Sequence, residues 1–209
     1  SGQKIESDGT DFTIASGAKL NLTPTSDVHI ANGKGMVIGH TAQITEPEAG
    51  EFQVLGTSST DAQVVIGRWG ANANPALLRF VKSRDPAIFD GTYAKLADND
   101  IVGRLEWYPD DDDDLTTTAA HFQAEVDDGS LEDGGVGMAF VWSQMPGGGT
   151  TAAIETMRIH ADGTLELNGD GTARDIAIIF DGNAVDYHIG LDDTACLLYT
   201  SDAADDLLC

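Results

Sequence analysis

The chain has 209 residues, with 35 acidic and 11 basic side chains and a formal net charge of -24. This acidity argues against nucleic acid as a partner, because phosphate binding requires clustered Lys and Arg, and it argues equally against anionic membrane surfaces. Apolar residues make up 41% of the chain, yet no apolar stretch approaches the roughly 20 residues of a membrane-spanning helix. The composition predicts a folded protein with no nucleic-acid partner and no membrane insertion.

The N-terminal region alternates apolar and polar residues with a period of two, which is the pattern of short β-strands. The apolar pairs are Phe12 with Ile14, Leu20 with Leu22, and Val28 with Ile30, separated by turn residues. Burial of the apolar surface of such small strands stabilises each strand pair by only a few kcal/mol, at about 25 cal/mol per Å². Ordering the backbone of each residue costs about 1–2 kcal/mol. We therefore expect residues 1–60 to form a slender stalk of β-solenoid or triple-β-helix type, in which identical chains wind round one axis.

The middle of the chain predicts longer and more aromatic strands. They cover residues 63–69, 76–82, 101–108 and 154–159. Apolar residues also alternate from Phe122 to Val126 and from Met138 to Trp142, and we expect one face of these two stretches to pack on a core. A Thr-rich stretch, residues 116–124, is a weak helix candidate. We expect an antiparallel β-rich knob over residues 61–168, with boundaries near residues 60–74 and 168–172.

Short strands return towards the C-terminus, at Leu165–Leu167 and Ile176–Phe180. Residues 169–195 are therefore predicted to start a further stalk repeat. The run from Cys196 to Asp205 resembles a translated sequencing-library transposon adapter, so we expect residues 196–209 to be a non-native tail. The chain's two cysteines both lie in that tail, which removes disulfides and thiol chemistry from the native part.

The candidates for chemistry are few. Asp110–Asp114 fails as an EF-hand loop, because Leu115 and His121 stand where Gly and Glu are required. A looser calcium site remains an alternative to a solvated acidic loop. The five histidines form neither an HExxH motif nor a close pair. The sequence predicts no catalytic residue, no cofactor-binding residue and no metal ligand, and it classes the protein as a non-enzyme.

Two features leave a glycan-related function open. Trp69, Trp107 and Trp142 could form a sugar-binding platform, although each lies in a predicted strand, where core packing is commoner. The chain has enough Asp and Glu residues to supply the two carboxylates that a glycosidase uses as acid and base, but the sequence singles out no pair.

Five sequence blocks resemble those of environmental phage tail-fibre proteins. They are residues 52–57 (FQVLGT), 75–84 (PALLRFVKSR), 100–107 (DIVGRLEW), 119–127 (AAHFQAEVD) and 155–163 (ETMRIHADG). Related proteins carry ERMRI in the last block, where Thr156 replaces the usual Arg, and continue towards a self-cleaving chaperone domain that this fragment lacks. Residues 179–193 also resemble phage structural proteins.

The resemblance implies a homotrimeric virion fibre in which interwoven β stalks carry β-rich knobs. Its partners would be other virion tail proteins and a glycan or protein receptor on the host surface. The family supplies no catalytic residues, and Arg84, Arg104 and Arg158 are expected to pair with the surplus acids. Exposed loops bind receptors most often, and the longest candidates are residues 110–118 and 130–135.

Two other functions stay open at this point. One is a glycan-binding or glycan-depolymerising tailspike module, which needs a groove with converging carboxylates and aromatic side chains. The other is a bacterial adhesin stabilised by calcium, which needs an ion site in the acidic loop.

Overall fold

The computed structural model describes residues 28–30, 34–48, 50–88, 90–129, 131, 134–147, 152–168, 176–180, 187–192 and 197–202. Every regular element in these ranges is a β-strand, so the fold is all-β, as the sequence predicts. In the same ranges there is no helix of the length and apolarity that crossing a membrane requires. The chain divides into two compact units, one of residues 1–43 and 50–63 and the other of residues 44–49 and 64–209.

The first unit contains a parallel pair of short strands, β1 (Met36–Ile38) and β2 (Phe52–Val54). Gly39 follows β1 with a φ of +88°, and a Cβ at this position would overlap the carbonyl of Leu55, so only glycine fits. Residues 28–30 form no strand, so that prediction is wrong. The predicted strands around Phe12 and Leu20 lie outside the described residues.

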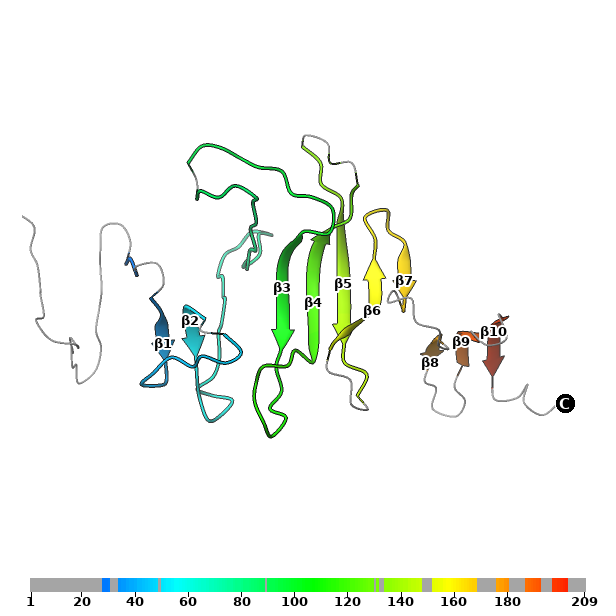
Figure 1. The fold of residues 1–209 in the computed structure, drawn as a ribbon, viewed down its shortest axis with the longest axis horizontal. Coiled ribbons are helices and arrows are strands. Elements are labelled where there is room, and N and C mark those ends of the chain that lie inside the picture. Colours follow the sequence, from blue (N-terminus) through cyan, green and yellow to red (C-terminus); the bar gives the residue numbers. More distant parts are fainter. Residues whose placement is uncertain are drawn as a thin grey trace, which may run out of the picture. The chain divides into compact units, whose positions relative to one another are not determined.

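The second unit contains a five-stranded antiparallel sheet (Figure 1). Its strands follow one another in chain order: β3 (Ile101–Trp107), β4 (Ala120–Val126), β5 (Met138–Gln144), β6 (Ile154–Ile159) and β7 (Leu165–Leu167). These strands confirm the predictions made from alternation. The weak helix over residues 116–124 is wrong, because its second half is β4, whose alternating apolar side chains pair across to β5.

A separate three-stranded antiparallel sheet follows in sequence, in the order β10–β9–β8. Its strands are β8 (Ile176–Phe180), which the sequence predicts, β9 (Tyr187–Asp192) and β10 (Leu197–Asp202). β10 lies within the adapter-like run and pairs with β9 along its whole length.

Residues 64–84 are a segment without any strand, and every residue in it is exposed. The strands predicted over residues 63–69 and 76–82 are therefore wrong for the single chain. Alternation gives a segment two distinct faces, but a strand forms only where another strand's edge pairs with it. In the single chain the segment forms no hydrogen-bonded ladder with β3, the edge strand that it touches through Phe80.

Phe80 is the point at which this segment touches the five-stranded sheet. A Cβ added to Gly103 on β3 would come within 2.5 Å of the Phe80 Cβ and Cγ. Phe80 therefore packs directly on the backbone of β3, and this contact requires glycine.

Replacing Gly103 with Ala tests that contact. We expect Gly103→Ala to lower the free energy of unfolding by about 1–3 kcal/mol, because the new methyl group forces Phe80 away. Gly135→Ala is the matched control, since a Cβ there meets no atom within 4 Å. Urea unfolding followed by circular dichroism measures both, and equal stability of the two variants would contradict the proposed contact.

Candidate interaction surface on the five-stranded sheet

One face of the sheet is built from apolar side chains. The strand register aligns two complete cross-strand rows on this face, which are Leu105, Phe122, Trp142, Met157 and Leu167, and Gly103, Ala124, Phe140, Ile159 and Leu165. Side chains of one face repeat every second residue, so both rows lie on the same side. We call this side, including Trp107 beside the first row, the apolar face. Neither row contains a charged residue.

Aromatic side chains form the centre of the apolar face, yet much of the face is open. The Phe122 ring lies 4.7 Å from that of Trp142 and 5.8 Å from that of Phe140, measured between ring centroids. Trp107 is 55% exposed and Phe140 45%. A hollow of about 230 Å³ lies beside Phe80. An exposed apolar surface of this continuity is typical of an interaction site.

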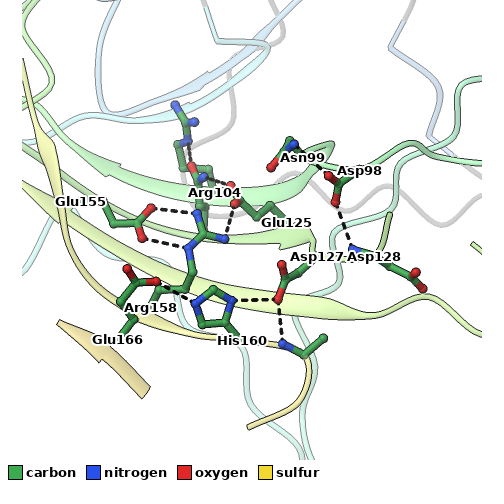
Figure 2. A network of polar contacts seen from close by, with 12 residues as sticks. Asp98, Asn99, Arg104, Glu125, Asp127, Asp128, Glu155, Arg158, His160 and Glu166 are labelled. Carbon is green, nitrogen blue, oxygen red and sulfur yellow. Dashed lines mark hydrogen bonds and ion pairs between the residues drawn. The ribbon is translucent and has the colours of Figure 1, made fainter. Parts of the chain in front are cut away.

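The opposite face is a network of charged and polar groups centred on Arg158 of β6 (Figure 2). Arg158 Nη1 lies 2.6 Å from Glu125 Oε1, and its Nε and Nη2 each lie 2.8 Å from an oxygen of Glu155. Glu125 also accepts a hydrogen bond from Gln123, whose amide oxygen accepts one from Arg104 at 2.7 Å. We call this side the polar face.

The predicted pairing of three arginines with acids is confirmed. Besides Arg158, Arg104 lies 3.1 Å from Glu106, and Arg84 lies 2.6 Å from Asp100. The Arg84 guanidinium donates two hydrogen bonds to Asp100, and these hold the pKa of that carboxyl far below its usual range. Arg158 keeps its charge, because hydrogen bonds to Glu155 and Glu125 raise its pKa.

Burial across the sheet is the reverse of the usual pattern. Along β5, Ala139, Val141 and Ser143 are buried on the polar face, whereas Phe140 and Gln144 are exposed on the other face. Long side chains explain this, because the Arg and Glu stems cover the small residues beneath them. The expectation that the alternating apolar residues of β4 and β5 pack on a core is confirmed only in part within the single chain, because Val126 is fully buried and Phe122 and Trp142 are half-buried, whereas Phe140 is exposed.

His160 connects the tight turn between β6 and β7 to the end of β4. Its Nδ1 lies 3.1 Å from Asp127 Oδ2 and its Nε2 lies 2.8 Å from Glu166 Oε2. Asp127 also accepts a hydrogen bond from the backbone N–H of Ala161. The carboxylates of Glu166 and Asp127 raise the pKa of His160, because they stabilise its charged form.

A polar hollow of about 290 Å³ lies near Arg104, lined also by His121 and by Thr116, Thr117 and Thr118. His121 Nδ1 is buried there and has no hydrogen-bond partner in the described part of the chain. Burial and the nearby Arg104 charge lower the pKa of His121, so the ring is neutral near pH 7. Sequence spacing gave no signal for this hollow, since it depends on the meeting of two loops and two strands.

The acidic loop uses its carboxylates on its own backbone. Asp110 accepts from the N–H of Asp112 at 2.9 Å, Asp111 accepts from Asp113 and Asp114, and Asp114 accepts from Thr116 at 2.7 Å. These are turns in which an Asp side chain bonds the backbone two or three residues later. Among the described residues, no three His, Cys, Asp or Glu side chains converge as a metal site.

The three tryptophans have different surroundings. Trp142 packs against Phe122 on the apolar face, and Trp107 lies on that face too. Trp69 belongs to segment 64–84, where its side chain is 91% exposed. The apolar face therefore carries two of the three residues that the sequence suggested for a sugar platform.

Comparison of the chain with protein-family models and with curated proteins gives no match.

Removing Arg158 tests whether it stabilises the polar face. Arg158→Met leaves Glu125 buried without its cation, and we expect a loss of about 3 kcal/mol in the free energy of unfolding. The control Arg104→Met removes a more exposed guanidinium, whose ion pair is worth about 1 kcal/mol or less. Urea unfolding measures the free energy of unfolding of both variants. If Arg158→Met loses no more stability than Arg104→Met, Arg158 does not stabilise the polar face.

His160 predicts a pH dependence of stability. Its pKa is raised in the folded state, so its stabilising contribution is complete below the unfolded value of about 6.5 and is lost as pH rises through the folded value. We expect the stability difference between the parent chain and His160→Gln to shrink from about pH 6 to about pH 9. His40→Gln is the control, and a difference independent of pH would refute the assignment.

Proposed function

We propose that the chain is a structural component of a phage tail fibre that assembles as a homotrimer, contributes to host-surface attachment and performs no catalysis. The observation that carries the proposal is the open apolar face of the five-stranded sheet, with two uncharged cross-strand rows. A sheet that leaves its aromatic side exposed is incomplete as a single chain. A self-assembling structural protein needs such a surface on every copy.

Identical copies suit this face because it carries no charge within a chain of net charge -24. Another copy can cover this face without desolvating an ion on it. The half-exposed apolar side chains include Leu105, Trp107, Phe140 and Leu165. Burying each of them stabilises the assembly by roughly 1 kcal/mol in every chain, so the total stabilisation grows with the number of copies.

The residues of the fibre-like sequence blocks support an architectural role, because they contact one another. Arg84 and Phe80, from one block, meet Asp100 and Gly103 of the next. Glu125 of a third block holds Arg158 of the last. Four separate motifs thus describe one structural unit, and their charged groups are engaged in holding strands together.

In this proposal residues 1–60 form the slender β-stalk, the sheet belongs to the knob over residues 61–168, and residues 169–195 begin a further stalk repeat. The fibre projects from the virion and joins other tail proteins. A glycan or protein receptor on the host would meet exposed loops, and in the candidate loop of residues 110–118, between β3 and β4, residues 110–113 are exposed.

Charge placed on the apolar face should prevent assembly. We expect Phe140→Glu to turn an elongated three-chain particle into single chains, because each copy would have to bury an unpaired carboxylate in the contact. Val136→Glu is the matched control, since Val136 is similarly exposed but lies outside the strands. Sedimentation velocity reports mass and elongation together, and the proposal fails if Phe140→Glu and Val136→Glu sediment alike.

A further inference from the structure

Segment 64–84 is a surface of its own. It has the alternating apolar pattern of strands, yet each of its residues is exposed and it has no strand partner. Its exposed apolar side chains include Val64, Val65, Ile66, Trp69, Leu77, Leu78 and Val81. So many apolar side chains in water predict a binding partner for the segment.

The charge of the segment is opposite to that of the protein. It contains Arg68, Arg79, Lys82 and Arg84, which are four of the eleven basic residues, and none of the 35 acidic residues. Lys82 and Arg84 already pair with Asp100 of their own chain, so Arg68 and Arg79 are the cations that the segment offers to an acidic second copy. Nucleic acid fits less well, because the surrounding acidic surface repels phosphate.

The C-terminal end of the segment is anchored to its own sheet. Phe80 packs on Gly103 of β3, and Arg84 bonds Asp100 just before that strand at 2.6 and 3.0 Å. Residues 64–78 extend from this anchor and can span about 50 Å at about 3.4 Å per residue. That reach is sufficient for the segment to arrive at a neighbouring molecule.

We propose that residues 64–78 of one copy lie over the apolar face of a second copy. The exchange covers the half-exposed side chains of Trp107, Phe140 and Leu165 with apolar residues. Exchange of a segment between identical chains is a low-cost route to oligomers. The inference rests on the self-association proposed above and adds the segment and the face that meet.

Photo-crosslinking between differently labelled copies tests the exchange. Full-length chains with Cys196→Ser and Cys209→Ser, which exclude adventitious disulfides, carry Trp69→p-benzoylphenylalanine. Light and heavy-nitrogen preparations are mixed, unfolded and refolded together, irradiated, and digested for mass spectrometry. We expect adducts that join a light and a heavy peptide, with the acceptor in β3 to β7. Tyr93→p-benzoylphenylalanine is the control, because Tyr93 is an exposed aromatic residue outside the segment.

The outcomes separate the inference from the proposed function. The exchange is overturned if the adducts lie within one copy, or on the second copy outside the five-stranded sheet. If the particle still contains three chains, the fibre proposal stands. Single chains in solution overturn both. The exchange is also overturned if the crosslinker at position 93 gives as many adducts on the sheet as the crosslinker at position 69. The sheet of one copy would then contact another copy without preference for residues 64–78.

A pair of substitutions provides an independent measurement. Leu78 is 64% exposed in the single chain, so Leu78→Asp leaves the folded monomer intact, but in the exchange it places a charge on the apolar face. We expect Leu78→Asp to weaken assembly about tenfold or more. Ile88→Asp, at an apolar residue that is 91% exposed beyond the segment, should change it less than about threefold. Equal effects of the two substitutions would overturn the exchange.

Discussion

The ion pairs of Arg158 determine which side of the five-stranded sheet can meet another molecule. The guanidinium on β6 reaches across β5 to Glu125 on β4 and also holds Glu155 on its own strand. On β5 the side chain passes over Val141, which pairs with Arg158, and Ala139, which pairs with Glu125, and both are buried. The polar face is closed by its own side chains. The aromatic residues of β4 and β5 lie on the other face, which in a single chain is covered only in part, by Phe80.

The same few cations explain how a strongly acidic chain can assemble. Arg104 and Arg158 neutralise acids inside the polar face, and Arg84 neutralises Asp100 beside β3. Salt screens repulsion between exposed acidic groups of different chains beyond about 8–10 Å. An uncharged face at the contact and a basic segment crossing it would keep like charges apart in the proposed fibre.

Strand positions could be predicted from the sequence because alternation is a local property. It located β3 to β8, and the surplus of acids predicted the arginine pairs. Alternation does not show what lies against each face, so it gave the wrong buried side for Phe140 and wrong strands within segment 64–84. The contact of His160 with Asp127 and Glu166 depends on strand register, which becomes visible only once the strands are paired.

The central claim is that the apolar face is covered by other copies of this chain. The mass of the full chain in solution, measured by light scattering on a sizing column, tests it most directly. The account predicts a single species of three times the chain mass of 22.0 kDa. A folded species with the mass of one chain would contradict it, because the apolar face would then be stable in water without a partner.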